Sequence, residues 1–133
     1  MDIIVPHTIK KKELGGTLSE EARKLFAKIK EKPGIAAGIS SPGLPARTTL
    51  HKIYATTAGG PRRLLFFCRQ AGAAASPKTD RWVLLFYRDK ADSLGQNMSS
   101  KNPDFTGQLA KNLRAALEDL ATSTPEHPKY DVL

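Results

Sequence analysis

The stretch "GGPRRLLFFCRQ", residues Gly59 to Gln70, places two adjacent arginines between a turn and an apolar run. Glycine and proline are typical turn residues, and the apolar run "LLFFC" after Arg63 is typical of a buried strand. The arginines therefore stand where a buried strand begins. They form either a strand end solvated by water or a pair of cations held on a rigid edge for an anionic partner.

Two further segments predict strands next to this one. Residues Leu50 to Thr56 show enough alternation for a strand, and the turn before Arg62 joins them to the apolar run as a hairpin. After the small-residue segment "AGAAASPKTD", the stretch "RWVLLFYRDK" predicts a third strand. Three consecutive strands with short connections predict an antiparallel meander.

The N-terminal part predicts a strand, a turn and a helix. The opening "DIIVPHTI" is β-branched, and Pro6 restricts such a strand to an edge or a bulge. The segment "KKKELGG" is expected to turn the chain. Thr17 and Glu20 match a capping box in front of an amphipathic helix, which Pro33 and Gly34 end.

The C-terminal part predicts one long helix. Asn102, Pro103 and Asp104 form a helix entry, and the apolar residues after them recur at helical spacing. We therefore expect an α+β fold, with a small antiparallel sheet (the three-strand meander plus the N-terminal strand) flanked by an N-terminal helical segment and a C-terminal helix. Residues 1–122 form one domain in this prediction. Residues 123–133 form an irregular tail, of which Tyr130 and the last two residues could dock back.

The charge of the chain is concentrated in its centre. The 21 Lys and Arg residues outnumber 13 Asp and Glu residues, which gives a net charge of +8. Between Arg47 and Lys90 there are nine basic and two acidic residues, a net charge of +7, so the remainder is almost neutral. This pattern favours either a phosphate-rich or acidic partner or a basic surface that keeps the protein dissolved.

Cysteine content and hydropathy narrow the class of protein. Cys68 is the single cysteine, so it makes no intramolecular disulfide, and its apolar neighbours indicate a buried small residue. No segment approaches the length of a membrane span, and the N-terminus lacks the order of a signal peptide. We expect a cytoplasmic protein with no membrane partner. No metal-ligand spacing, catalytic triad or phosphate-cradling loop is present, and we expect no metal or cofactor.

Element order and two motifs together resemble the RelE and HigB family of bacterial toxins, the toxic halves of toxin–antitoxin pairs. The matching stretches are "LHKIYATTAGGPRRLLFFCR" and "WVLLFYRDKADSLGQNMS". The resemblance implies an antiparallel sheet flanked by helices, cleavage of messenger RNA, in many members only within the ribosome, and a cognate antitoxin as partner. Relatives in fold inhibit DNA gyrase instead. The chain departs from the family pattern in its longer alanine-rich loop, in Pro61 and in "YRDK", where "Y-x-K-N" is more usual.

Metal-independent RNA cleavage needs a base for the 2′-hydroxyl, charge stabilisation at phosphorus and a proton for the leaving oxygen. The family register assigns the phosphate clamp to Arg62. Strand alternation sends Arg62 and Arg63 to opposite faces, so only one of them reaches the site. Arg63 is the physical competitor for this role and otherwise a phosphate contact.

Further candidates lie on all three strands. Tyr87 is the candidate base or base-stacking residue, and Arg88 or Lys90 supplies a second phosphate contact. Neighbouring cations are expected to lower the pKa of such a tyrosine or lysine. The alternative is that Tyr87 packs against the last helix. Additional phosphate contacts are assigned to Lys52, Arg69 and Arg81, and the alternative for Lys52 is a solvated surface cation. His51 is the only serious histidine candidate, but it neighbours Lys52 and points to the opposite face.

Three functions remain open from the sequence. The first is a ribonuclease toxin that acts on messenger RNA in the context of the ribosome and is masked by its antitoxin. The second is a toxin of the same fold that inhibits gyrase or another protein without cutting RNA. The third is a nontoxic nucleic-acid-binding module, whose binding would depend steeply on salt.

Overall fold

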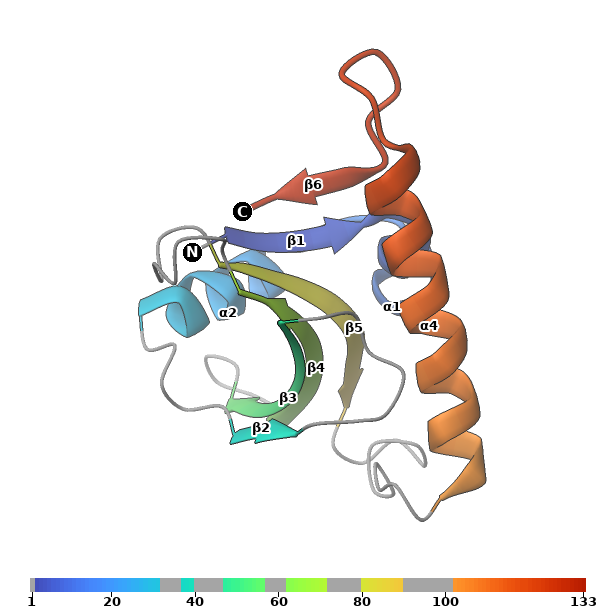
Figure 1. The fold of residues 1–133 in the computed structure, drawn as a ribbon. Helices are drawn as coiled ribbons and strands as arrows, with labels where there is room; N and C mark the ends of the chain where they lie inside the picture. Colours follow the sequence, from blue (N-terminus) through green and yellow to red (C-terminus); the bar gives the residue numbers. More distant parts are fainter. Residues whose placement is uncertain (1, 32–36, 40–46, 57–61, 72–79, 90–101) are drawn as a thin grey trace.

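The computed structural model describes residues 2–31, 37–39, 47–56, 62–71, 80–89 and 102–133. Within these residues the elements follow in the order β1 (Asp2–Pro6), α1 (His7–Leu14), α2 (Glu20–Glu31), β2 (Ala37–Ile39), β3 (Thr48–Thr56), β4 (Arg62–Gln70), β5 (Arg81–Asp89), α4 (Pro103–Thr122) and β6 (Tyr130–Val132). The strands form one sheet in the order β2-β3-β4-β5-β1-β6 (Figure 1). The α+β prediction is confirmed, with β2 and β6 as additions to it.

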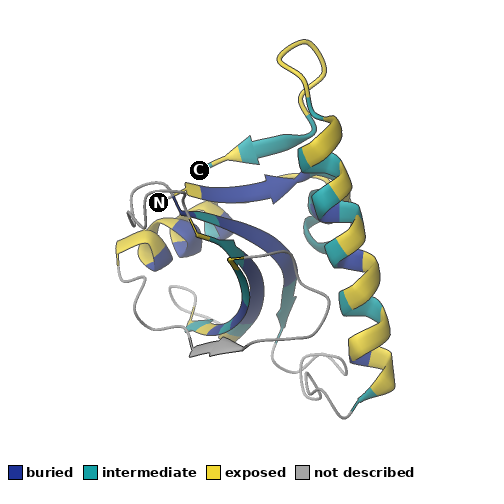
Figure 2. Ribbon diagram, viewed as in Figure 1, coloured by how far each residue is buried: buried dark blue, intermediate teal, exposed yellow. Residues whose placement is uncertain are grey.

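The predicted meander is β3, β4 and β5. β3 pairs with β4 antiparallel along its whole length, from Thr48 opposite Gln70 to Thr56 opposite Arg62. β4 pairs with β5 antiparallel, with a bulge where the register shifts between Phe66 and Phe67. These strands carry most of the fully buried side chains, and Figure 2 shows β4 and β5 largely dark blue. The apolar run that predicted a buried strand therefore forms the centre of the core.

The N-terminal strand lies inside the sheet, so the prediction of an edge strand was wrong. β1 pairs in parallel with β5 through Asp2 to Ile4, and antiparallel with β6 through Ile4 to Pro6. Pro6 is the last residue of the strand and lies beyond the pairing with β5. Its missing amide hydrogen therefore removes no bond to β5, and its φ of −60° suits the entry to α1.

The segment expected to turn the chain is mostly helical. α1 runs to Leu14 and ends where Gly15 adopts φ 67° and Gly16 adopts φ 88°. The amide of Gly16 donates to the carbonyl of Lys10. Lysine, glutamate and leucine are good helix formers, and buried Ile9 anchors the helix to the core. The turn therefore begins only at the glycines, which adopt positive φ without strain.

Helix α2 begins later than the capping box predicted. Its capping hydroxyl belongs to Ser19, whose Oγ accepts from the amide of Ala22 at 3.1 Å, and not to Thr17. The buried side chains of the helix match the predicted apolar spacing and are Ala22, Leu25, Phe26 and Ile29. The predicted start of α4 is confirmed, because Asn102 accepts from the amide of Asp104 at 3.1 Å.

The helices cover both faces of the sheet. On one face, Phe26 of α2 lies edge-on to Tyr87 of β5, with ring centroids 6.2 Å apart. On the other, Phe105 of α4 contacts Phe66 and Phe86, with centroids 5.5 and 5.7 Å apart. We name these sides the α2 face and the α4 face; α1 packs beside α4 (Figure 1).

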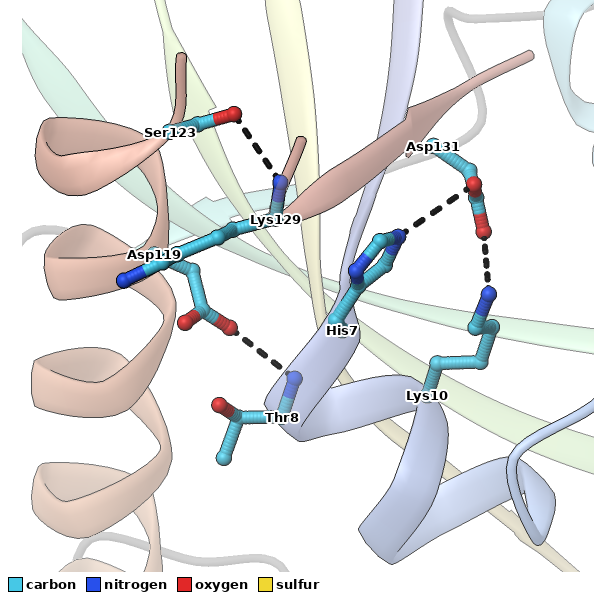
Figure 3. Close-up of polar contacts among 7 residues, drawn as sticks. All are labelled: His7, Thr8, Lys10, Asp119, Ser123, Lys129 and Asp131. Atoms are coloured by element: carbon cyan, nitrogen blue, oxygen red, sulfur yellow. Dashed lines mark hydrogen bonds and ion pairs between the residues drawn. The ribbon is translucent and has the colours of Figure 1, made fainter. Parts of the chain in front are cut away.

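The tail expected to be irregular ends in a strand. β6 pairs with β1, and the amide of Leu133 donates to the carbonyl of Ile3 at 2.8 Å. Side chains hold this strand to α1, because Asp131 contacts both His7 at 3.4 Å and Lys10 at 2.7 Å (Figure 3). The tail therefore adds the last strand to the sheet. In this way Tyr130 and the last two residues dock back onto the domain, which the sequence had left open.

Candidate functional site

Arg63, Tyr87 and Glu21 converge on the α2 face at the ends of two neighbouring strands. Arg63 Nε donates to Glu21 Oε1 at 2.9 Å, and the Tyr87 hydroxyl donates to the same oxygen at 3.0 Å. The Arg63 guanidinium also lies 6.0 Å from the centroid of the Tyr87 ring. We name Glu21, Arg63, Tyr87 and Asp89 the α2-face cluster.

Strand register and helix packing place the members of this cluster. Asp89 pairs directly with Arg63 across β4 and β5, so both side chains lie on one face, and Arg63 Nη1 donates to Asp89 Oδ2 at 2.9 Å. Glu21 comes from the first turn of α2, which the packing of Phe26 holds against Tyr87. The Glu21 and Asp89 side chains are 39% and 44% exposed, so an external ligand can reach them.

The ionisation of the cluster follows from these contacts. The hydrogen bond from Arg63 is the main cause that lowers the pKa of Glu21, and burial opposes it. The same bond raises the pKa of Arg63. Burial, together with the hydrogen bond to Glu21, raises the pKa of Tyr87 to about 12. At neutral pH the cluster thus holds a carboxylate, a guanidinium and a neutral phenol.

The expected lowering of the pKa of Tyr87 was wrong. Arg63 does lower it, but burial and the carboxylate of Glu21 oppose this effect and outweigh it. A phenol whose hydroxyl already donates to a carboxylate resists losing its proton. Tyr87 is therefore suited to donate a proton and unsuited to act as a base. It also packs against a helix, but that helix is α2 and not the last one.

Arg62 and Arg88 lie on the α4 face, away from the cluster. Arg62 is exposed and makes no ion pair with the described residues. Arg88 Nε donates to Glu13 Oε1 at 2.8 Å and Arg88 Nη2 to Glu13 Oε2 at 2.9 Å, which ties β5 to α1. The prediction that Arg62 and Arg63 point to opposite faces is confirmed. The structure brings Arg63 and Tyr87 together and separates Arg62 and Arg88 from them.

Two more candidates from the sequence are Lys52 and Lys90. Lys52 pairs with Phe66 on that face, and its Nζ lies 5.8 Å from the ring centroid of Tyr54, which is 47% exposed. Lys90 lies outside the described residues. Lys52 is therefore a surface cation on the same face as Arg62.

Arg69 and Arg81 occupy the opposite ends of β4 and β5 from the cluster. Arg69 lies on the α2 face, bonds to Asp80 and stacks over Trp82 at 5.7 Å. Arg81 Nη2 donates to Gln70 Oε1 at 3.0 Å. His51 is buried on the α2 face with its ring centroid 4.8 Å from that of Trp82. None of these residues contacts Arg63 or Tyr87 within the described part of the chain.

The charge of the central segment is partly neutralised from outside it. Glu21 of α2 and Glu13 of α1 bind two of its arginines, while Asp80 and Asp89 bind from within. Sequence reasoning missed both glutamates because each lies far along the chain from the arginine that it binds. The count of +7 therefore overstates the positive charge this region presents.

Cys68 is buried, and burial raises the pKa of its thiol to about 11, so it is the unreactive small residue that was predicted. Among the described residues, no group of three or more His, Cys, Asp and Glu side chains could hold a metal ion. None of the helices described here is long and apolar enough to cross a membrane.

Comparison with known proteins identifies no relative of this chain. No family model matches the chain, no curated protein resembles it significantly, and no solved structure matches its fold. The structure itself shows a small α+β protein with a mixed sheet and helices on both faces.

Proposed function

We propose that this protein is a metal-independent endoribonuclease that cleaves messenger RNA as the toxin of a toxin–antitoxin pair. The proposal rests on the motifs and element order that resemble the RelE and HigB family. The observation that carries it is the convergence of Arg63 and Tyr87 on one carboxylate oxygen of Glu21 at a half-buried strand end. A cation, a base and a proton donor within one site are the groups that cleavage by the 2′-hydroxyl needs.

Each member of the cluster takes one role. Glu21, ionised at neutral pH, removes the proton of the 2′-hydroxyl as the 2′-oxygen bonds to phosphorus. Arg63 stabilises the negative charge of the pentavalent phosphorus through its planar fork. Asp89 orients that guanidinium. Tyr87, whose raised pKa keeps it protonated, gives a proton to the 5′-oxygen as its bond to phosphorus breaks.

The cluster then returns to its starting state without help from solvent. After one turnover Glu21 holds a proton and Tyr87 has lost one. Their hydrogen bond, 3.0 Å long, passes the proton back. The products are a 2′,3′-cyclic phosphate and a 5′-hydroxyl end. This scheme assigns the clamp to Arg63 in place of Arg62, because Arg62 lies on the other face of the sheet.

The proposed activity also implies partners of the protein and a location in the cell. The partners are messenger RNA, with the ribosome as the setting of cleavage, and an antitoxin that masks the site. The Glu21 and Asp89 side chains of the α2-face cluster are partly exposed, which leaves room for such masking. A protein that cleaves messages acts in the cytoplasm.

Expression of the protein without an antitoxin tests this proposal. RNA ends are mapped during growth arrest, and the chemistry of the 5′ ends is determined. Wild type and the Arg62→Ala control should both arrest growth and leave 5′-hydroxyl ends, whereas Arg63→Ala should do neither. Intact messages in arrested cells would exclude cleavage, and DNA breaks in those cells would favour gyrase inhibition. Salt-dependent RNA binding without any growth effect would favour a binding module.

A further inference from the structure

A cavity of about 500 Å³ lies at the far end of the hairpin of β3 and β4 from the α2-face cluster. Its described lining consists of Arg47, Thr48, Thr49, Arg69 and Ala71. Arg69 is six residues from Arg63 on the same strand, which at roughly 3.3 Å per residue separates them by about 20 Å. We propose that this cavity binds the phosphate group of a nucleotide-sized ligand.

Arg69 is held rigidly with one edge of its guanidinium turned away from its partner. Its Nε donates to Asp80 Oδ2 at 3.0 Å, its Nη2 bonds to the same oxygen, and the group stacks over the Trp82 ring. The Asp80 side chain is only 6% exposed, whereas that of Arg69 is 38% exposed. Arg69 Nη1 has no hydrogen-bond partner in the described residues, so it can donate to an anion in the cavity.

The second cation of the cavity is fixed by the backbone. Arg47 adopts a left-handed conformation with φ 62°, which residues other than glycine rarely take. Its carbonyl accepts from the amide of Ala71 at 3.1 Å, so the residues just outside the paired ends of β3 and β4 are bonded to each other. Arg47 is exposed and lines the cavity together with Arg69. Strained backbone that is kept in place often marks a functional position.

Hydroxyl groups complete the lining. Thr49 Oγ1 lies 2.7 Å from Nε2 of His51, a buried residue that stacks on Trp82. The Thr49 hydroxyl is thus oriented by the neighbouring His51 ring, which stacks on Trp82. Two guanidinium groups and hydroxyls form the donor set that recognises phosphate. A volume of about 500 Å³ also lies in the range of small-molecule sites, roughly 300–1,000 Å³.

This site does not depend on ribonuclease activity, because none of its residues belongs to the α2-face cluster. The phosphate could come from a free nucleotide or from an RNA chain, and the two sources present the same chemistry to the arginines. Trp82 is the only tryptophan of the chain and lies against Arg69, so its fluorescence reports directly on the cavity.

Titration of the full chain followed by Trp82 fluorescence and calorimetry tests the proposal. The probes are AMP, adenosine, inorganic phosphate and a short single-stranded RNA. AMP should bind, inorganic phosphate should compete with it, and adenosine should bind at least about tenfold more weakly. Binding of RNA but not AMP would support the site with RNA as its source of phosphate if Arg69→Gln weakens that binding, because the proposed function also places RNA at the α2-face cluster. No binding of AMP or RNA at millimolar concentration, or equal binding of AMP and adenosine, would overturn it.

Substitutions of the two cavity arginines test whether the ligand binds in this cavity. Arg69→Gln and Arg47→Gln should each weaken the binding of whichever of AMP or RNA binds by about tenfold or more, because each removes a charged donor. Circular dichroism verifies that both variants keep the folded state. Arg81→Gln, which alters an arginine of the next strand on the α4 face, should bind as wild type. Unchanged binding in both cavity variants would contradict the proposal.

Discussion

Arg88 binds both carboxylate oxygens of Glu13, with Nε to Oε1 at 2.8 Å and Nη2 to Oε2 at 2.9 Å. The same carboxylate accepts from the amide of Tyr87 at 3.1 Å, and the Glu13 side chain is fully buried. This bidentate pair joins α1 to β5 immediately beside the α2-face cluster. It therefore supports the position of Tyr87 while Arg88 itself faces the other side of the sheet.

Removal of Glu13 should destabilise the protein strongly. In Glu13→Ala, Arg88 and the Tyr87 amide lose their acceptor in a buried position, and we expect a loss of about 3–5 kcal/mol in the free energy of unfolding. Urea unfolding measures it. Glu20→Ala is the control, because Glu20 pairs with Lys24 on the surface of α2 and should cost less than about 0.5 kcal/mol. Equal effects of the two substitutions would contradict a structural role for Glu13.

Substitutions in the cluster should separate the two neighbouring arginines. Arg63→Ala should reduce the cleavage rate by about 10²–10³-fold, as the loss of a transition-state donor typically does. Arg62→Ala should reduce it by less than about tenfold, or 1.4 kcal/mol. Rates are measured on RNA in a translation mixture, with circular dichroism to verify folding. The reverse ranking would restore Arg62 as the clamp.

Tyr87→Phe should separate proton donation from packing. The variant keeps the ring that contacts Phe26 and the Arg63 cation, but it loses the hydroxyl that bonds to Glu21. We expect cleavage to fall by about 10²-fold or more with little change in the melting temperature. A substrate with a sulfur leaving group, which needs no protonation, should largely restore the rate. A variant that stays as slow with that substrate would exclude the acid role.

Asp131 should make the protein sensitive to acid. Burial alone would raise its pKa, but the bonds from Lys10 and His7 outweigh burial, and the pKa is lowered in the folded state. The ionised carboxylate therefore contributes stability above its unfolded pKa, near 4, and that stability is lost as pH falls through the lower folded pKa. Unfolding measured from pH 7 to pH 2 should show this loss.

The substitution Asp131→Asn should flatten the acid limb of that curve. Asp104→Asn is the matched control, since Asp104 is an exposed acid in the first turn of α4 with no ion pair among the described residues. It should leave the acid limb almost unchanged. Identical curves for wild type and Asp131→Asn would show that the contact between β6 and α1 adds no stability.

Phe105 should account for much of the attachment of α4. Its ring is 4% exposed and contacts both Phe66 and Phe86. Phe105→Ala should cost about 3–5 kcal/mol in the free energy of unfolding, because it leaves a cavity in the core. Val132→Ala, at an apolar residue that is 55% exposed, should cost far less. A small effect at Phe105 would show that α4 is held mainly by its other contacts.

Much of the architecture follows from local patterns. The apolar run after Arg63 became the central strand, and Asn102 capped α4 at the predicted residue. The predictions were wrong at positions where one sequence feature is compatible with two different structures. Pro6 indicated an edge, yet a proline at the end of a strand is tolerated inside a sheet when the pairing stops short of it. The lysines before Gly15 indicated a turn, although their intrinsic preference is helical.

The candidate site was less predictable than the fold. Alternation along one strand separated Arg62 from Arg63, because the side-chain period of a strand is two. It could not show which face would carry an acidic partner. Glu21 lies 42 positions before Arg63 in the sequence, and only the packing of α2 brings the two together. The predicted direction of the pKa shift of Tyr87 was wrong for the same reason, since burial in the folded chain raises this pKa and the distant carboxylate of Glu21 adds to that effect.

By itself the sequence determined the three strands of the meander, the N-terminal strand, the helices α2 and α4, their order, and which residues of a strand share a face. These depend on periodicity and on local turn and cap chemistry. Tertiary structure alone decided which charges are paired. Ion pairs such as Arg63 with Glu21 and Arg88 with Glu13 join elements far apart in the chain. A short-range charge interaction depends on separation in space, which residue spacing along the chain does not specify. The two arginines of "GGPRRLLFFCRQ" thus differ through α2, which gives one of them a carboxylate and leaves the other exposed.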